Sequence, residues 1–193
     1  MQQSILKSKV VISNNINLTI KIVLTSLLAA TAIALRLFKH IIIGPIQIIN
    51  LPAVFCILAA LLLGSTSGAS VGIISYIVSD LILGFGPWTL VNAIFMGIIG
   101  VGVGNLKNRI SNKYQLFIFI MILLFVNDVM TSSILYLFLG FNFIEAFTIS
   151  LLGLFLPTLG GFMFAIGPIT EISSSLLVIM TRPLIEKALN EVI

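Results

Sequence analysis

Long apolar runs, separated by short stretches that carry Gly, Pro, Lys or Arg, follow one another along most of the chain. A helix that crosses the hydrocarbon core of a bilayer needs about 20 predominantly apolar residues. Six runs have a suitable length, which predicts an all-α, polytopic membrane protein with six transmembrane helices. The predicted spans are Ile22–Phe38, about Ile48–Leu63, Gly68–Phe85, Trp88–Gly104, Leu116–Leu139 and about Pro168–Ile185.

A further apolar stretch, Glu145–Ile166, is interrupted by a proline and two glycines, and whether it crosses the membrane affects the topology. Lys and Arg concentrate in cytoplasmic loops. Six spans with the N-terminus inside place Lys7, Lys9, Lys21, Lys107, Arg109, Lys113, Arg182 and Lys187 inside, and Arg36 and Lys39 outside. A seventh span would reduce this split from 8 against 2 to 6 against 4. We therefore expect an apolar external loop or re-entrant segment over 142–167, a cytoplasmic lead over 1–20 and a single transmembrane domain over 21–190.

The composition excludes several classes of protein. Apolar residues make up 59% of the chain and charged residues 8%, which excludes a soluble globular domain. The net charge of +4 is spread over loops, so no nucleic-acid partner is expected. Single Cys56 and His40 residues exclude a disulfide framework and a zinc site with several Cys and His ligands. The glycines from Gly100 to Gly104 lack the Gly-Lys-Ser/Thr ending of a phosphate loop, so any ATP hydrolysis must belong to another subunit.

Small residues recur at helical spacing in two of the predicted spans. Ser26, Ala30 and Ala34 lie four residues apart in the first span, with Ala29 beside them, and the fourth span carries glycines at 97, 100 and 104. Small residues allow close helix–helix approach in a membrane. Packing within the bundle explains the glycines, whereas the first-span stripe fits either internal packing or contact with another protein.

Several short motifs occur in a characteristic order from the second predicted span to the fourth. They are Leu51-Pro52, Leu63-Gly64, Gly68-Ala69, Gly72, Ser79-Asp80, Gly86-Pro87-Trp88 and the glycines from Gly97 to Gly104. This order, together with the length and topology, resembles the substrate-binding S components of energy-coupling factor (ECF) vitamin transporters. The resemblance runs from about residue 20 to residue 190. The apolar loop before the last span is longer than the resemblance leads us to expect.

The resemblance implies a division of labour in an ABC-type importer. The chain would capture a vitamin or related micronutrient outside the cell, without a cofactor of its own, while a T component and two ATPase subunits supply the power. The first-span pattern of Ala29, Ala30 and Ala34 looks like the family's AxxxA signature for docking on the T component. The implied location is the plasma membrane of a prokaryote, with both termini cytoplasmic. The residues do not distinguish riboflavin, thiamine, cobalamin, biotin or nucleobase derivatives.

Polar residues within the spans are candidates for the substrate site, because an ionisable group is costly in a bilayer. Threading the six-span topology places most of them in the external half, with two near mid-depth. The candidate substrate-binding residues are Arg36, Lys39, Asp80, Trp88, Asn92, Asn127, Asp128, Glu145 and Glu171. We expect Asp80, which lies near a helix C-terminus, to need a partner such as Arg36, Lys39 or the ligand.

Structural roles are the alternatives for the same residues. Glu171 follows Pro168 and fits an acid in the first turn of a helix, where the helix dipole favours it. Trp88 fits an interfacial belt residue. Asn127 and Asp128 fit an interhelical hydrogen-bonded pair that holds the bundle together.

Other functions fit the sequence less well. An ion-coupled secondary transporter, with Asp80 and Asp128 carrying protons or sodium, is the main alternative, but the two halves of the chain show no convincing repeat. An intramembrane enzyme is not expected, because no His-Glu-x-x-His or Gly-x-Ser-x-Gly motif is present. A structural subunit without a ligand also remains open.

Overall fold

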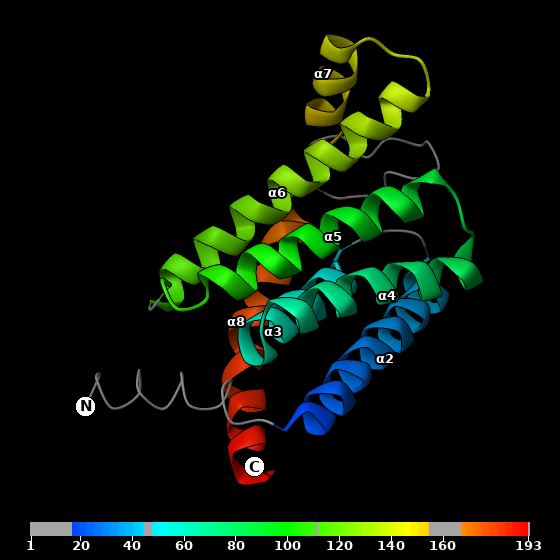
Figure 1. Cartoon of the computed structure of the whole chain (residues 1–193). Coiled ribbons are helices and arrows are strands. Elements are labelled where there is room, and N and C mark those ends of the chain that lie inside the picture. Colours follow the sequence, from blue (N-terminus) through cyan, green and yellow to red (C-terminus); the bar gives the residue numbers. More distant parts are fainter. Residues whose placement is uncertain (1–16, 45–47, 111, 155–166, 193) are drawn as a thin grey trace.

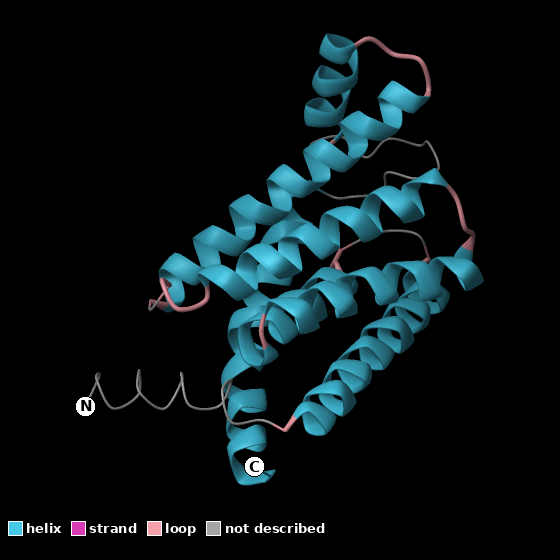
Figure 2. Cartoon of the chain, viewed as in Figure 1, coloured by secondary structure: helices cyan, strands magenta, loops and turns pink. Residues whose placement is uncertain are grey.

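The computed structural model describes residues 17–44, 48–110, 112–154 and 167–192, and the described residues form helices joined by short loops (Figures 1 and 2). The first sixteen residues of the predicted cytoplasmic lead lie outside the described residues. The helices are α2 (Leu18–Ile43), α3 (Leu51–Leu63), α4 (Ser65–Leu83), α5 (Pro87–Leu106), α6 (Lys113–Phe138), α7 (Phe143–Gly153) and α8 (Gly167–Val192).

The short helix α3 forms the centre of the bundle. It packs against α2, α4, α5 and α8, and all of its residues from Pro52 to Leu63 except Phe55 are buried. A helix that is apolar on every side lies either in a protein core or in the hydrocarbon of a membrane. Its start is fixed by Asn50, whose Oδ1 accepts a hydrogen bond from the backbone N–H of Ala53 at 3.2 Å. These contacts place α3 in the core rather than at the lipid-facing surface.

Four helices within the described part of the chain are long and apolar enough to cross a membrane: α2, α4, α5 and α6. They confirm four of the predicted spans and a multi-pass helical membrane protein. The expected count of six is not reproduced. Predicted span 48–63 forms a helix of 13 residues, about 20 Å long, because Asn50 caps it and Gly64 ends it. Predicted span 168–185 lies in the 26-residue α8, which polar residues make less apolar than the other four.

The predicted close packing of the glycines in the fourth span is confirmed. A Cβ atom at Gly100 would lie 2.4 Å from the backbone nitrogen of Ala69, and one at Gly104 would lie 2.4 Å from the Cα of Ser65. Because no side chain separates them, the C-terminal half of α5 lies directly against the N-terminal half of α4. By contrast, a Cβ at Gly102 would meet nothing within 4 Å.

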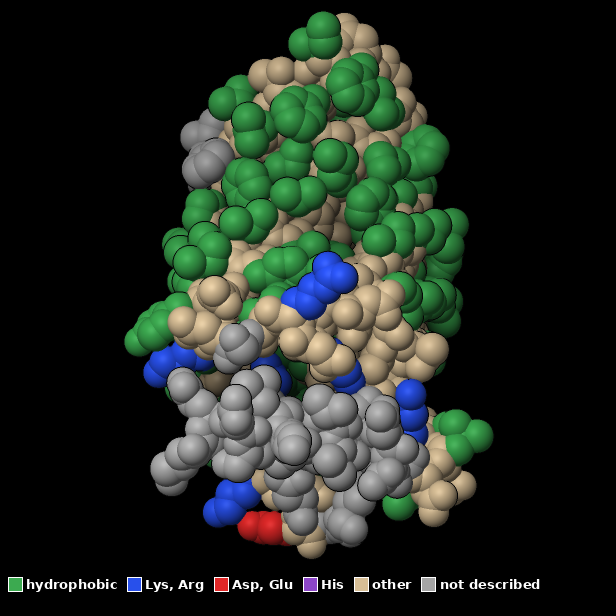
Figure 3. Space-filling model, turned by 60° about the vertical axis from the view of Figure 1, so that its left-hand side comes forward, with side chains coloured by type: hydrophobic (Ala, Val, Ile, Leu, Met, Phe, Trp, Pro, Cys, Tyr) green, Lys and Arg blue, Asp and Glu red, His purple; other side chains and the backbone are tan. Residues whose placement is uncertain are grey.

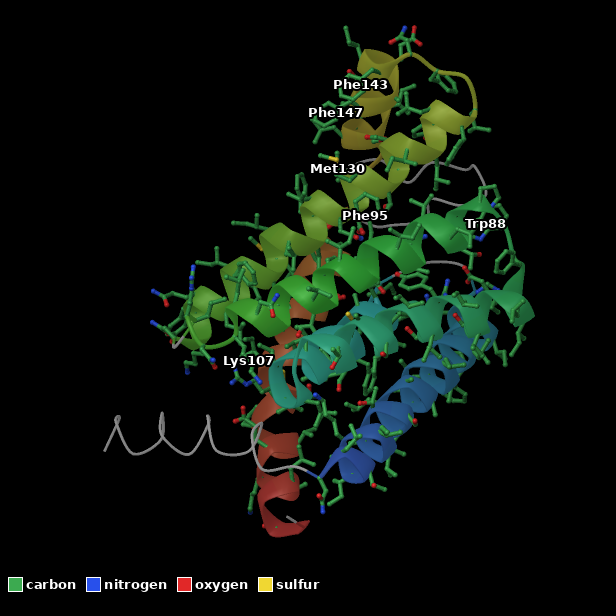
Figure 4. All side chains as sticks on the ribbon, viewed as in Figure 1. Trp88, Phe95, Lys107, Met130, Phe143 and Phe147 are labelled. Atoms are coloured by element: carbon green, nitrogen blue, oxygen red, sulfur yellow. The ribbon has the colours of Figure 1, made fainter. Side chains whose placement is uncertain are left out.

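The two ends of the bundle differ in charge. At the Lys107 end, Lys107 lies near Lys21 of α2 and Arg182 of α8, and burial together with these two charges lowers the pKa of Lys107. Figure 3 shows Lys and Arg side chains gathered toward one end, below a broad hydrophobic surface. The opposite end, called here the Trp88 end, carries the turn from α4 to α5, where Trp88 lies (Figure 4).

The predicted external segment 142–167 contains a helix. Helix α7 packs on α6, and its exposed N-terminus forms a capping box. Asn142 Oδ1 accepts from the backbone N–H of Glu145 at 3.0 Å, and Glu145 Oε2 accepts from the N–H of Asn142 at 3.2 Å. With only 11 residues, α7 is too short to span a bilayer, and residues 155–166 lie outside the described residues.

Candidate substrate-binding site

A buried ion pair joins α2 to α4 at the Trp88 end. Arg36 Nη2 lies 2.8 Å from Asp80 Oδ1, and the Thr89 hydroxyl donates to Asp80 Oδ2 at 2.8 Å. Arg36 also donates to the Ser79 hydroxyl, and its guanidinium carbon lies 4.8 Å from the centre of the Tyr76 ring. Arg36 is thus the partner that the position of Asp80 required. Both oxygens of this carboxylate, whose side chain is only 3% exposed, already accept from groups of the chain.

The hydrogen-bonded network continues from Tyr76 to α8. The Tyr76 hydroxyl donates to Asn50 Oδ1 at 3.0 Å, and the Asn50 backbone N–H donates to Ser174 Oγ at 2.9 Å. One residue earlier on α8, the Ser173 hydroxyl donates to the backbone carbonyl of Ile48 at 2.5 Å. The segment that leads into α3 is therefore attached to α8, and the N-terminal part of α8 is held against the centre of the bundle.

Polar atoms without hydrogen-bond partners are buried between α6 and α8. They are Asn127 Oδ1, both carboxylate oxygens of Glu171, and Ser175 Oγ. Asn127, Glu171 and Ser175 are 3%, 1% and 0% exposed. The Asp128 carboxylate lies within electrostatic range of Glu171 and also of Tyr76. We call Asn127, Asp128, Glu171 and Ser175 the α6–α8 cluster.

Buried polar groups without partners are rare, because each one costs about 1–3 kcal/mol. Asn127 Oδ1, the Glu171 carboxylate oxygens and Ser175 Oγ are therefore candidates for contact with a bound molecule. Their chemistry is that of hydrogen-bond acceptors: a carboxylate, an amide oxygen and a hydroxyl that can also donate. Among the described residues, no group of three or more His, Cys, Asp or Glu side chains lies close enough together to hold a metal ion.

The structure contradicts two structural roles predicted as alternatives for cluster residues: a first-turn acid at Glu171 and an interhelical pair of Asn127 and Asp128. Glu171 lies beyond the first turn of α8, which begins at Gly167, and its carboxylate caps no backbone group. Asn127 and Asp128 do not bond across two helices. Asn127 Nδ2 donates to Asp128 Oδ1 at 2.9 Å between neighbours on α6, which leaves the amide oxygen of Asn127 unused.

The remaining candidate residues lie apart from the α6–α8 cluster or have structural contacts. Asn92 Nδ2 donates to the backbone carbonyl of Trp88, and the Trp88 ring lies so close to Gly86 that a Cβ there would be 2.3 Å from it. Figure 4 shows Trp88 near the start of α5, at the opposite end from Lys107. Lys39 is partly buried on α2, near Arg36, and Glu145 caps α7.

Sequence reasoning missed Asn50, Tyr76, Ser174 and Ser175. A signal for the two serines was present, because Thr170, Glu171, Ser174 and Ser175 repeat with helical spacing and form a polar stripe on an otherwise apolar helix. Asn50 could have been identified as the helix cap before Leu51-Pro52, although not as the partner of Tyr76.

Some small residues of α2 are buried in the bundle, and others lie on its outer surface. Ala29 and Ala32 are buried, and Ala29 packs in a cluster with Ala59 and Val71. Ser26, Ala30 and Ala34, at four-residue spacing, are exposed, and no helix of the described part of the chain covers them. These three residues are called here the α2 small-residue face.

The family model of the ECF-type riboflavin transporter S component matches residues 16–169, which include every helix from α2 to α7. No curated protein and no solved structure matches the chain. Because the family model covers well over half of the chain, the protein belongs to the family of S components of ECF-type riboflavin transporters.

Proposed function

We propose that this chain, which its family makes a substrate-binding subunit of a transporter, binds riboflavin through the α6–α8 cluster. The observation that carries the proposal is the set of buried acceptor atoms of Asn127 and Glu171 that lack partners. Riboflavin carries four ribityl hydroxyl groups and a ring N–H, all hydrogen-bond donors. A ligand with many donors would satisfy these atoms and remove their desolvation cost.

The surroundings of the cluster also suit a flavin. Small-molecule sites combine apolar walls with a few polar groups that fix orientation. The apolar residues of α3 and α6 supply such walls, and the Tyr76–Asn50–Ser174 hydrogen bonds hold α4, α3 and α8 in a fixed relation. The aromatic residues Phe85, Trp88 and Phe141 lie at the Trp88 end, where a flat ring would enter.

The proposed topology follows from charge. With six spans, including the short α3 and the polar α8, the Lys107 end faces the cytoplasm and the Trp88 end faces outside. Both chain termini are then cytoplasmic, in the plasma membrane of a prokaryote. The α2 small-residue face docks on a T component, which is powered by two separate ATPases. Its exposure supports this role, since Ser26, Ala30 and Ala34 would allow a partner helix to approach closely.

The test is a titration of the purified full-length chain with riboflavin, followed by flavin fluorescence. We expect saturable binding. Glu171→Ala should weaken binding about 10- to 100-fold, the loss expected for a hydrogen bond to a charged group. The matched control is Glu191→Ala, which removes the same side chain from an exposed position on the same helix and should leave the affinity unchanged. Absence of riboflavin binding by a folded chain, or stabilisation by thiamine or biotin instead, would contradict the proposal.

A second candidate, ion-coupled transport, is favoured only by the buried carboxylates Asp128 and Glu171. Asp80 does not support it, because its carboxylate is paired with Arg36. Uptake by cells that survives collapse of the ion gradient but requires ATP would exclude this alternative.

A further inference from the structure

Three cations from three different helices meet at the Lys107 end of the bundle. Lys21 lies near the start of α2, Lys107 directly follows α5, and Arg182 belongs to the C-terminal half of α8. Burial lowers the pKa of Lys107, and the nearby charges of Lys21 and Arg182 lower it further. A Cβ at Gly64 would lie 4.0 Å from Lys21 Nζ, and the last turn of α5 lies against Ser65. Lys21, Lys107 and Arg182, called here the basic cluster, therefore gather near the turn from α3 to α4.

The carboxylates at this end are too few to balance the cations. The described cations are Lys21, Lys107, Arg109, Lys113, Arg182 and Lys187, and the described carboxylates are Glu186 and Glu191. Six positive charges against two negative ones leave an excess of four. The topology of a membrane protein accounts for basic residues at a cytoplasmic end, but it does not require three of them to converge from separate helices. Their mutual repulsion is unfavourable unless an anion joins them.

The basic cluster borders the apolar surface of the bundle. Exposed apolar side chains follow Lys21 along α2 and flank Arg182 on α8. They are Ile22, Val23, Leu27, Met180 and Leu184. Figure 3 shows Lys and Arg side chains at the edge of the broad hydrophobic surface. In a bilayer, lipid tails cover such a surface and their headgroups lie just beyond the hydrocarbon core, which is the depth of the basic cluster.

We propose that the basic cluster binds the phosphate of an anionic phospholipid headgroup, in the cytoplasmic leaflet under the topology given above. Basic pockets between transmembrane helices are typical headgroup sites on this side of a membrane. Lys21 and Lys107 supply ammonium charges, and Arg182 supplies a guanidinium, whose planar fork suits phosphate oxygens. Arg182 Nε donates to Glu186 at 2.7 Å, and the guanidinium carries four further N–H donors. A bound headgroup relieves the repulsion between the three cations and joins α2, α5 and α8.

The first experiment measures thermal unfolding of the purified full-length chain in an uncharged detergent with added lipid. Phosphatidylglycerol at a hundredfold excess over its Kd should raise Tm by about 5–10 °C, because it binds the folded chain. Phosphatidylcholine, whose phosphate is balanced by a cationic choline, and inorganic phosphate, which has no lipid tail, should each raise Tm by much less. Equal shifts with the two lipids, or the full shift with inorganic phosphate, would overturn the inference. Riboflavin takes no part in this measurement, so either result leaves the proposed function untouched.

The second experiment assigns the lipid effect to the basic cluster. Lys21→Gln and Lys107→Gln each remove one charge and keep a long polar side chain, so each should weaken the apparent affinity for phosphatidylglycerol about fivefold. Two separate variants keep the test valid if one of them fails to fold. Lys187→Gln is the matched control, because it removes a cation that is 79% exposed on α8, and it should leave the lipid affinity unchanged.

The same variants distinguish a lipid site from a contact with another protein. An affinity for phosphatidylglycerol that is unaltered in both Lys21→Gln and Lys107→Gln would overturn the inference. If those variants also failed to co-purify with the T component, the basic cluster would be a protein contact instead.

Discussion

Removal of the Asp80 carboxylate should destabilise the folded chain, because Asp80 is the centre of the polar network between α2, α4 and α5. Its two oxygens accept from Arg36 and Thr89, each at 2.8 Å. Asp80→Ala removes the counter-ion of Arg36, whose side chain is only 21% exposed. Breaking a buried pair by removing one partner costs about 3–5 kcal/mol. Because Arg36 keeps its contacts with Ser79 and the Tyr76 ring, we expect the lower end, about 3 kcal/mol.

The assay is thermal unfolding of the purified chain in one detergent. For a chain of this size, 1 kcal/mol corresponds to about 2–4 °C, so Tm should fall by about 6–12 °C. Thr89→Val removes one hydrogen bond of the network, and should cost about 1–2 kcal/mol. The double variant Arg36→Met/Asp80→Leu removes both charges and should recover most of the lost stability.

Two results would refute this reasoning. One is an unchanged Tm in Asp80→Ala. The other is a double variant Arg36→Met/Asp80→Leu whose loss of stability equals the sum of the losses measured for Arg36→Met and Asp80→Leu alone, which would mean that Arg36 and Asp80 are not coupled. A loss of riboflavin affinity at normal Tm would assign Asp80 a direct role in ligand binding instead of the structural role argued from its contacts.

Two further predictions concern the small residues. Gly100→Val should destabilise the chain by about 1–3 kcal/mol, because the added side chain collides with the α4 backbone. The control is Gly102→Ala, whose added methyl group meets free space and should leave Tm unchanged or higher. Equal changes in Tm for the two variants would contradict the packing of α5 on α4. Ala30→Trp and Ala34→Trp should abolish co-purification with the T component and vitamin uptake, while riboflavin affinity stays at the wild-type value. A parallel loss of riboflavin affinity would mean that the α2 small-residue face packs inside the chain.

The α2 small-residue face shows what a sequence pattern can predict and what it cannot. The spacing of Ser26, Ala30 and Ala34 predicts a smooth helix face but not its partner, because the same spacing serves internal and external contacts. Only the rotation of α2 about its axis decides this point. In the structure Ala29 faces the bundle and Ala30 faces away from it, although the two are neighbours in the chain.

Local hydropathy determined the helices α2, α4, α5 and α6, because a span of about 20 apolar residues has few alternatives to a transmembrane helix. Charge determined that Lys21, Lys107 and Arg182 would share one end, and elementary electrostatics determined that Asp80 needed a partner. These are properties of short segments, and the sequence alone contains them.

The tertiary structure decided which polar groups meet and which do not. The Asn50–Ser174 hydrogen bond joins residues 124 positions apart, and such a contact leaves no periodic trace in the sequence. In the folded chain, both carboxylate oxygens of Asp80 accept from Arg36 and Thr89, whereas both carboxylate oxygens of Glu171 have no hydrogen-bond partner. Two carboxylates of similar appearance in the sequence therefore have different roles, because the free energy of a buried charge depends on the groups that packing places around it.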